Sequence, residues 1–406
     1  MKYYLKCCNC GCEISSFSVW FGQKQFCPDC GSRHVEVVYL ADYSLLIDLQ
    51  GSASTSFWRY FDLLPLENRD NIVSFGEGAV QLEEWLFLNQ FAKDNYGVNC
   101  RVYAYRNDLN GGTNTLKDVA ASMTASVLKE NGITQYCTSS TGNSATAYAR
   151  YMSEAGIRFT NFAPASMNLS TIDEIRSYNQ KVVISVGDYA QAKREAAEFS
   201  EKNNILMSIG NIDPLRVEAK RTMVFEFIRQ LGRLPDIYMQ AVAGGTGPIA
   251  LEKGVREINE RLPGVFKLPR MLLIQQDMCD PMVQAWEKAK KNGFKVNFEN
   301  EYPVIENPPT SVFILSAGNP GMYPLVAKIV QKSVGDFLRI KEAELLDYAY
   351  LVRNEKNIHI GPAATVCFAG FYQALKENKI QHGETVVMNI GESGKRYPDF
   401  AFRQAQ

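Results

Sequence analysis

Residues 133–164 read ITQYCTSSTGNSATAYARYMSEAGIRFTNFAP. A short apolar run, ITQYCTS, comes first, an amphipathic helical stretch, ATAYARYMSEAG, follows it, and a second apolar run, IRFTNFAP, ends the segment. Apolar runs of this length, separated by a helical stretch, are typical of two parallel strands joined by a crossover helix. This segment therefore predicts one βαβ unit.

The same alternation recurs further along the chain. An apolar run is followed by a helical stretch in IRFTNFAP and STIDEIRSYNQ, KVVISVG and DYAQAKREAAEFSEKN, NILMSIG and RVEAKRTMVFEFIRQLG, DIYMQAVAGG and PIALEKGVREINERL, and RMLLIQQ and DPMVQAWEKAKKNG. Repeated units of this kind predict an α/β fold with mostly parallel sheets and helices on both faces. One set ends near Gly210 and another begins near Asp236, so we expect two three-layer αβα halves.

The domain boundaries follow from this pattern. We expect a small cysteine-rich domain over 1–40, a first α/β half over 41–230 and a second over 231–406. The stretch from Asn297 to Pro309 contains three prolines and is predicted to be a loop. A chain of 406 residues with 46% hydrophobic residues is long enough for two or three domains with proper cores.

The near-equal numbers of basic and acidic residues argue against a polyanionic partner. Lysine plus arginine number 43 and aspartate plus glutamate 44, so no net field favours nucleic acid or an anionic membrane. The start, MKYYLKCC, lacks the apolar core of a secretion signal, and there is no uncharged apolar run of 18 residues or more. We expect a soluble, cytoplasmic protein that binds small molecules.

Six of the ten cysteines fall within the first 30 residues. Two pairs, Cys7-x2-Cys10 and Cys27-x2-Cys30, are each followed by a glycine, and four thiolates at this spacing can close a tetrahedral zinc site. Such a site has no open coordination position, so its role would be structural. Cys8 and Cys12 could substitute as ligands or stay spare, and a cysteine-rich hairpin without metal is the alternative.

The other four cysteines lie in apolar surroundings and are expected to be small buried hydrophobes; they are Cys100, Cys137, Cys279 and Cys367. A cytoplasmic chain is not expected to pair them as disulfides.

Residues 111–123, GGTNTLKDVAASM, lead from a polar turn into a helical pattern. Thr113 or Thr115 could cap a helix that carries Val119, Met123 and Val127 on one face and ends near Gly132. A lysine at a helix start opposes the helix dipole, so Lys117 gains nothing from local structure. It is either a solvated surface lysine or a functional amine.

Three further loops follow predicted strands, at the edge where ligands collect in such sheets. Residues 138–146, TSSTGNSAT, offer small hydroxyl side chains and Asn143, although this loop could simply cap a helix. The loop AVAGGTGPIA places Gly244, Gly245, Thr246 and Gly247 before a helix, which favours phosphate binding by backbone amides. The last loop, NIGESGKRYPDF, contains Ser393.

In this order and spacing, the segments resemble the pyridoxal-phosphate (PLP) enzymes of the tryptophan-synthase β-like fold (fold type II), threonine synthases in particular. The segments that carry the resemblance are FWRYFDLLP, FGEGAVQLEEW, TNTLKDV, SSTGNSATAYA, NIDPLRVEAKRTMVFEFIRQLG, SAGNPG and GPAATVCFAGF. Amino-terminal LxCxxCG pairs also precede some threonine synthases, which supports the zinc hypothesis. The resemblance covers most of the chain and implies that PLP binds in a cleft between the two halves.

The resemblance also implies roles for particular residues. Lys117 would form the Schiff base with PLP and then move the Cα proton of the substrate. Asn143 would bond the ring hydroxyl, the loop Gly244–Gly247 would hold the phosphate, and Ser393 would face the pyridine nitrogen. Substrate contacts are expected from Ser140, Thr141 and Thr115. The partner would be a small amino acid, and a homodimer is possible because relatives are often dimers.

Several positions depart from the threonine synthase pattern. Asp118-Val119-Ala120 replaces Asp-Arg-Gly after the lysine, Val80 replaces a threonine, and Gly361 replaces a glutamate. Ile390, before Gly391, stands where the family has the threonine that faces the pyridine nitrogen, so the candidate hydroxyl, that of Ser393, lies outside the family's own position. We expect these changes to remove polar contacts with substrate and to alter specificity.

Three functions remain open on this basis. The leading one is loss of phosphate from O-phosphohomoserine and addition of water, as in threonine synthase. The second is β-replacement through an aminoacrylate on O-phosphoserine or a related amino acid, as in cysteate or cysteine synthase, and it could serve secondary metabolism. The third is a family member without activity, whose cysteine-rich domain binds a protein partner.

Overall fold

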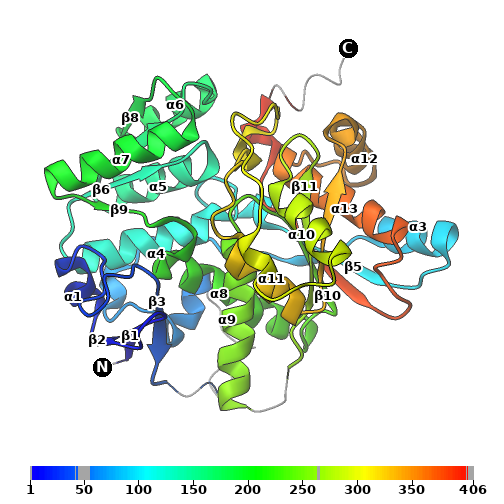
Figure 1. Cartoon of the computed structure of the whole chain (residues 1–406), viewed down its shortest axis with the longest axis horizontal. Helices are drawn as coiled ribbons and strands as arrows, with labels where there is room; N and C mark the ends of the chain where they lie inside the picture. The colour runs from blue at the N-terminus through cyan, green and yellow to red at the C-terminus, as the bar shows by residue number, and fades with distance from the viewer. Residues whose placement is uncertain (1, 42, 44–54, 263–265, 399, 401–406) are drawn as a thin grey trace. The chain divides into compact units, whose positions relative to one another are not determined.

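The computed structural model describes residues 2–41, 43, 55–262, 266–398 and 400. The chain divides into two compact units (Figure 1). Unit 1 contains residues 1–79, 110–113 and 117–222, and unit 2 contains residues 80–109, 114–116 and 223–406. The predicted domain boundaries and the predicted cleft stay predictions.

Unit 1 begins with a small cysteine-rich knuckle. Strands β1 (Tyr3–Cys7), β2 (Glu13–Ile14) and β3 (Val35–Tyr39) form an antiparallel sheet in the order β2-β1-β3, and α1 (Phe17–Gly22) packs on it. Strands β1 and β3 alternate buried and less buried residues, which is the pattern of a sheet with one covered face. Phe17 and Trp20 of α1 are fully buried and complete this small core.

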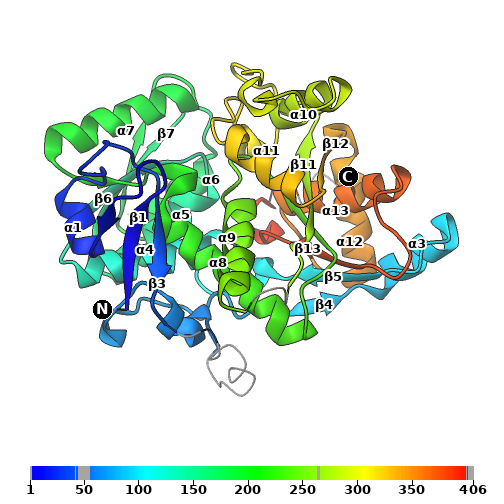
Figure 2. The same ribbon diagram turned by 60° about the horizontal axis from the view of Figure 1, so that its bottom comes forward.

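The main sheet of unit 1 is parallel and has the order β8-β7-β6-β9. Its strands are β6 (Gln135–Ser139), β7 (Arg158–Ala163), β8 (Lys181–Ile184) and β9 (Leu206–Met207). The crossover helices are α5 (Asn143–Glu154), α6 (Leu169–Ser177) and α7 (Tyr189–Asn203). Because such crossovers are right-handed, α5 and α6 cover one face, and α7, whose connection runs back across the sheet, covers the other. Figure 2 shows these helices around the sheet.

Two longer helices complete unit 1. Helix α4 (Lys117–Glu130) packs against α5, and its residues from Asp118 to Leu128 are all buried, so it is an interior helix and not an amphipathic surface helix. Helix α8 (Pro214–Leu231) starts in unit 1 and continues into unit 2.

Unit 2 is built around a six-stranded sheet of order β12-β11-β10-β13-β5-β4. The strands are β4 (Leu82–Glu84), β5 (Arg101–Tyr105), β10 (Ile237–Ala241), β11 (Arg270–Gln276), β12 (Asp336–Ile340) and β13 (Thr385–Asn389), and only β4 pairs antiparallel with its neighbour. The prediction of two mostly parallel sheets is therefore confirmed. The sequence pattern did not indicate that β4 and β5 join this second sheet.

The helices of unit 2 lie on both faces of its sheet. They are α3 (Leu86–Tyr96), α9 (Thr246–Arg261), α10 (Pro281–Lys291), α11 (Tyr323–Lys332), α12 (Leu345–Lys356) and α13 (Pro362–Lys376). Helices α9 and α11 pack together, as do α12 and α13. Helix α13 lies against β10 to β13, and Phe368 contacts Trp85 edge-on with ring centroids 5.8 Å apart. This apolar layer forms the main core of unit 2.

Short 3-10 helices occupy the connections; those described are η2 (Phe57–Leu63), η3 (Arg69–Asn71), η4 (Asn107–Leu109), η5 (Gly210–Ile212), η6 (Phe298–Asn300), η7 (Phe313–Leu315), η8 (Glu342–Glu344) and η9 (Gly394–Arg396). The predicted loop over 297–309 is irregular apart from η6.

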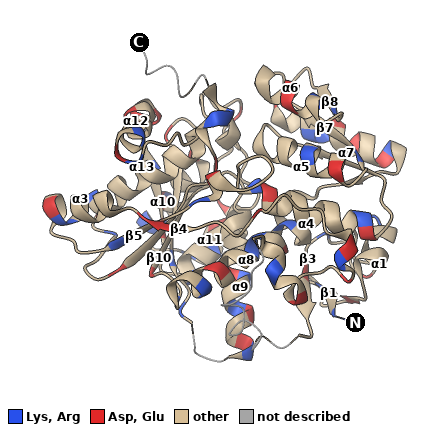
Figure 3. Cartoon of the chain, turned by 180° about the vertical axis from the view of Figure 1, so that it is seen from behind, with Lys and Arg blue, Asp and Glu red and all other residues tan. Residues whose placement is uncertain are grey.

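Basic and acidic side chains are intermixed on the helices of both units, as the charge balance predicted (Figure 3). Within the described part of the chain, no helix is both long enough and apolar enough to span a bilayer.

Candidate functional site

Lys117 is the first residue of α4. The turn that precedes it in the chain is fixed by the side chain of Asp118, the residue that follows it. The buried carboxylate of Asp118 accepts hydrogen bonds from the backbone N–H of Thr113 at 2.9 Å and from its hydroxyl at 2.7 Å. The residue directly before the helix is Leu116, and capping by Thr113 or Thr115 stays a prediction. The helix does end as predicted, with Gly132 just beyond it.

Two glycines let this turn pass close to its neighbours. Gly112 has φ +87°, and a Cβ atom there would lie 2.6 Å from the hydroxyl of Tyr151. A Cβ at Gly111 would overlap the carbonyl oxygen of Phe75. Close approach therefore requires both glycines, and at Gly112 the backbone conformation requires one as well.

A buried carboxylate supports the same turn. Glu77 accepts hydrogen bonds from the hydroxyl of Tyr151 and the backbone of Phe75, both at 2.8 Å, and from Ser74 at 3.0 Å. Burial is the largest influence on Glu77 and raises the pKa of its carboxyl, although these hydrogen bonds oppose the shift. The backbone around Lys117 is thus fixed by polar contacts inside unit 1.

Sequence reasoning missed a second lysine near Lys117. Lys220, on α8, is only 4% exposed, and no hydrogen bond or ion pair of its amine occurs among the described residues. Its pKa lies well below the ordinary value, first because of burial and then because of the positive charges of Lys117 and Arg216. Arg216 lies one turn earlier on α8. The spacing Arg-x3-Lys was visible in the sequence, but burial of the lysine was not.

The loop that contains Asn143 follows β6. Asn143 is the first residue of α5 and is 6% exposed. The hydroxyl of Ser140 accepts hydrogen bonds from the backbone of Gly142 at 3.3 Å and of Ala145 at 3.2 Å, so it caps this helix. Thr141, between them, is half-buried. Helix capping therefore involves Ser140, and Asn143 lies after the carboxyl end of β6, where its role toward a cofactor stays a prediction.

In unit 2 the glycine loop joins β10 to α9. Gly245 has φ +91° and precedes the first helical residue, Thr246. A Cβ atom at Gly245 would overlap Val326, and one at Gly247 would overlap the side-chain amide of Gln240. The bare backbone therefore turns tightly here, and the first N–H groups of a helix have no partner within it. Such a cradle fits a phosphate group, without a cationic side chain.

The loop after β13 runs beside the segment that leads into Lys117. Leu116 donates its backbone N–H to the carbonyl oxygen of Gly391 at 2.9 Å, and Ser393 donates its N–H to that of Asn114 at 3.0 Å. Thr115 forms a bridge with Glu392. Strand β13 lies between β10 and β5 and runs parallel to both. The carboxyl ends of the three strands are therefore adjacent. The glycine loop, the loop after β13 and the segment before Lys117 all begin there.

Gly361, which stands where the resembled family has a glutamate, lies beside another glutamate in the structure. The side chain of Glu392 fills the space beside Gly361, where an added Cβ would lie 2.5 Å from its Cγ atom. Its carboxylate accepts a hydrogen bond from the backbone of Ala363 at 2.7 Å, at the start of α13. A carboxylate from another segment, that of Glu392, therefore lies beside Gly361, and the expected loss of polar contacts with substrate stays a prediction.

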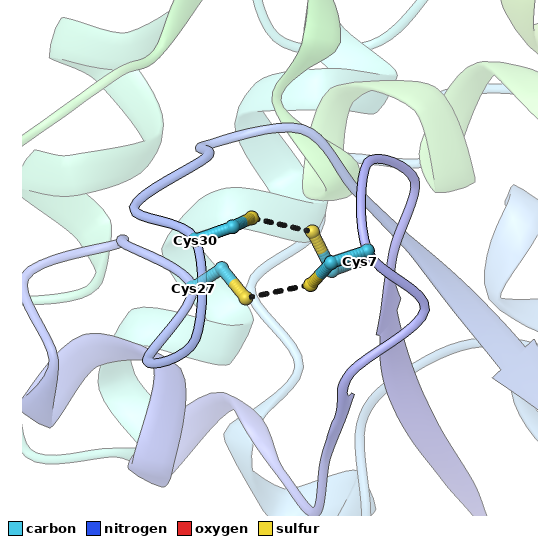
Figure 4. Close-up of side chains that lie close together, drawn as sticks. Cys7, Cys27 and Cys30 are labelled. Carbon is cyan, nitrogen blue, oxygen red and sulfur yellow. Dashed lines mark hydrogen bonds between the residues drawn. The ribbon is translucent and has the colours of Figure 1, made fainter.

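The four predicted metal ligands cluster in the knuckle, and Figure 4 labels three of them, Cys7, Cys27 and Cys30. Their sulfur atoms all lie within 4.8 Å of one another, and the pairs Cys7–Cys30 and Cys10–Cys27 are 3.6 Å apart. Tetrahedral Zn–S bonds of about 2.3 Å would separate sulfurs by about 3.8 Å. The donor set therefore fits a zinc ion.

The backbone repeats around the two cysteine pairs. Cys7 and Cys27 each accept a hydrogen bond from the glycine four residues later, at 2.9 Å, and both glycines have positive φ. The N–H of Cys7 donates to Cys12 at 2.9 Å and that of Cys27 to Ser32 at 2.8 Å. Cys8 is exposed and Cys12 is partly exposed, and neither belongs to the four-sulfur cluster. The four scattered cysteines are buried and free, as predicted.

A match to a known protein family identifies the family of this chain. Residues 74–391, well over half of the chain, match the model of the family described as "Pyridoxal-phosphate dependent enzyme". The chain belongs to this family. The matched segment contains Lys117, Asn143 and the glycine loop.

Curated relatives narrow the family further. Threonine synthase of Methanosarcina acetivorans is 27% identical over 394 residues, which cover 95% of this chain and 90% of the relative. Threonine synthase of Methanocaldococcus jannaschii is 25% identical over 392 residues, covering 93% and 90%. This PLP-dependent enzyme is thus related to threonine synthases over most of its length.

Solved structures agree on the fold. A mutant of O-ureido-L-serine synthase with O-ureido-L-serine bound has a TM-score of 0.63 at 17% identity, covering 84% of this chain and 95% of that one. Threonine deaminase isoform 2 of Solanum lycopersicum has a TM-score of 0.62 at 17% identity, covering 90% of each. The predicted fold type II architecture is confirmed.

Proposed function

We propose that this PLP-dependent enzyme removes phosphate from O-phosphohomoserine and adds water, as a threonine synthase does. The observation that carries the proposal is the placement of Lys117. This amine stands at the start of a buried helix, after a turn fixed by Asp118, in a chain related to threonine synthases along most of its length. A lysine is not needed there by the helix, whose dipole disfavours it.

The residues present fit PLP. We propose that Lys117 joins the cofactor aldehyde, that the amides of Gly244, Gly245, Thr246 and Gly247 hold its phosphate, and that Asn143 bonds its ring hydroxyl. Ser393 is the proposed partner of the pyridine nitrogen, and its hydroxyl already accepts a hydrogen bond from the backbone of Lys395 at 3.3 Å. Bound PLP supplies an electron sink for the substrate carbon from which a proton is removed.

The chain's own contribution is to hold the substrate and to move protons. With PLP and substrate bound, the amine of Lys117 would accept the Cα proton and later return a proton. Burial lowers the pKa of the neighbouring Lys220 well below the ordinary lysine value, which disfavours a second positive charge beside Lys117. Substrate contacts are proposed for Ser140, Thr141 and Thr115.

A second candidate is favoured by the residues after the lysine. Val119 and Ala120, in place of arginine and glycine, are 3% and 2% exposed, so no cationic side chain directly follows Asp118. An enzyme of this kind could instead carry out β-replacement on O-phosphoserine or a similar amino acid. Loss of the arginine is the observation that supports a substrate other than O-phosphohomoserine.

The knuckle has a separate proposed role. We propose that Cys7, Cys10, Cys27 and Cys30 hold a structural zinc ion, because their sulfur geometry matches a four-thiolate site with no open position.

Phosphate release distinguishes the functions. Release from O-phosphohomoserine alone, with threonine as product, supports the first proposal. Release from O-phosphoserine only when a sulfur nucleophile is present supports the second. A purified protein that lacks the visible absorption of bound PLP and cannot be reconstituted with it would contradict both.

A further inference from the structure

The knuckle is connected to α8 by a buried hydrogen bond. Tyr39, the last residue of β3, is 1% exposed and donates its hydroxyl to a carboxylate oxygen of Glu218 at 2.8 Å. Glu218 lies on α8 and is fully buried. A buried carboxylate that loses a donor retains the full cost of its desolvation, so this contact fixes its position strongly.

A second contact joins the same two elements. Arg221, also fully buried, pairs with Glu218 through Nε at 2.9 Å and donates to the hydroxyl of Tyr43 at 3.0 Å. It also donates to the carbonyl oxygen of Leu63, and its guanidinium lies 4.6 Å from the ring centroid of Tyr39. The side chains of Glu218 and Arg221 therefore fix the rotation of α8 about its axis.

The first residue of β3 and the residue before it contact the cysteine loop that follows β1. Cys7 ends β1 and pairs with Val35, the first residue of β3. Cys8 donates its N–H to the carbonyl oxygen of His34 at 3.0 Å, just before that strand. Because both cysteine pairs hold the loops that precede and flank β3, a bound zinc ion would fix the strand whose other end carries Tyr39.

The same helix carries Lys220, whose buried amine was described above. Lys220 stands between Glu218 and Arg221 in sequence and projects from a different face of α8. It is 4% exposed, and the positive charges of Lys117 and Arg216 both act on it. Asp213 and Tyr148 interact electrostatically with Arg216. A small rotation of α8 would therefore move Lys220 relative to Lys117.

We propose that Tyr39 is a positioning residue, through which the zinc-holding knuckle sets the rotation of α8 and with it the place of Lys220 beside Lys117. The proposal rests on the proposed function for the role of Lys117 and on the proposed zinc site. It predicts that the metal in the knuckle and the cofactor site are energetically coupled.

Hydrogen exchange tests the connection without cofactor chemistry. Exchange of the peptide 214–222 is measured by mass spectrometry in the full-length PLP-loaded protein, before and after zinc removal by EDTA, for wild type and Tyr39→Phe. Zinc removal from wild type and the Tyr39→Phe substitution should each speed exchange by about fivefold, the equivalent of one hydrogen bond. Zinc removal from the variant should add little, because the hydrogen bond from residue 39 to Glu218 is already absent.

Tyr4→Phe is the matched control. Tyr4 lies in β1, opposite Val38, and no hydrogen bond of its hydroxyl occurs among the described residues. This variant should exchange like wild type and respond to zinc removal in the same way. If Tyr39→Phe fails to fold, Glu218→Gln replaces it, since it keeps the volume and removes the charge that Tyr39 and Arg221 contact.

A spectroscopic readout tests the effect on Lys117. The visible spectrum of bound PLP is titrated with pH, and Tyr39→Phe and zinc removal should shift its midpoint in the same direction, with no shift in Tyr4→Phe. Unchanged exchange at 214–222 on zinc removal, or independent additive effects of zinc removal and Tyr39→Phe, would overturn the inference. A missing PLP band with the exchange pattern intact would instead count against the proposed function alone.

Discussion

Glu392 occupies the space that a side chain at residue 361 would need. Its Cγ atom would lie 2.5 Å from a Cβ added to Gly361, and its carboxylate binds the N–H of Ala363 at 2.7 Å. A carboxylate at the start of α13 also interacts favourably with the helix dipole. The glycine and the glutamate therefore form a matched pair, and neither can be exchanged alone without a cost.

This pairing is testable by a swap. Gly361→Glu alone should lower the melting temperature and the activity, because two glutamate side chains cannot share the space. The double variant Gly361→Glu, Glu392→Gly should recover much of both losses, since one carboxylate again lies beside α13. Thermal unfolding and phosphate release are the measurements, and a double variant no better than the worse single variant would contradict the pairing.

The Schiff-base role of Lys117 predicts a specific loss. Lys117→Ala should abolish turnover and the adduct with PLP that borohydride reduces, while the far-UV circular dichroism stays that of wild type. The control is Lys129→Ala, an exposed lysine in the last turn of the same helix. Retained turnover in Lys117→Ala would exclude this lysine as the cofactor's partner.

The zinc site predicts a stoichiometry. Metal analysis of wild type should find about one zinc per chain, and the variant Cys27→Ser, Cys30→Ser should lose it, since two thiolates cannot hold a four-ligand site. The matched control is Cys8→Ser, Cys12→Ser, which removes the two nearby thiols outside the cluster. Equal zinc content in both double variants would contradict the assigned ligand set.

The glycine loop predicts a loss of cofactor affinity. Gly247→Ala places a methyl group against the side chain of Gln240, which accepts a hydrogen bond from Tyr238 at 2.8 Å. Overpacking of this kind costs on the order of 1–3 kcal/mol, so PLP should bind about tenfold more weakly or worse. Gly321→Ala, where nothing lies closer than 4.0 Å, is the control. Fluorescence titration with PLP measures both, and equal affinities would exclude this loop from the site.

Lys220 predicts a pH dependence of stability. Its pKa is lowered in the folded chain, so between that value and the ordinary lysine pKa the unfolded chain binds one more proton. The free energy of unfolding should therefore rise with pH in this window, by up to about 1.4 kcal/mol per pH unit from this one group. Equivalently, the free energy of unfolding decreases as the pH is lowered towards the pKa that Lys220 has in the folded chain.

Denaturant unfolding at pH 7, 8 and 9 measures that slope. Lys220→Met should remove this contribution and be more stable than wild type at pH 7, because it no longer buries an amine that lacks a partner among the described residues. The exposed Lys129→Met is the control and should keep the wild-type slope. Identical slopes in wild type and Lys220→Met would show that the buried amine does not lose its proton on folding.

The parts of the fold that the sequence predicted are those with a local signal. The unit from β6 to β7 has its strand and helix periods within about 30 consecutive residues, as a βαβ unit requires, and the structure agrees with it. The strand β5 has no such signal for its partner, since Arg101 pairs with Thr385 at the other end of the chain. Pairing over that distance depends on tertiary packing, which the periodicity of one segment does not contain.

The same distinction applies to the site. Lys117 could be proposed because the ordered set of segments resembles a known family, and the cysteine pairs because their spacing is typical of a zinc site. Lys220 and Glu392 could not, because what distinguishes them is burial beside residues far away in the chain. Gly361 was identified as a departure from sequence alone, but only the structure shows which side chain replaces the missing one.

The order of strands in unit 2 has a consequence for synthesis. Strand β13, near the carboxyl terminus, lies between β10 and β5, so the centre of this sheet leaves the ribosome last. Until then β5 and β10 each have an edge that could pair with other nascent chains, a hazard that chaperones would have to limit. Translation stopped before residue 385 would leave a chain that cannot complete this sheet.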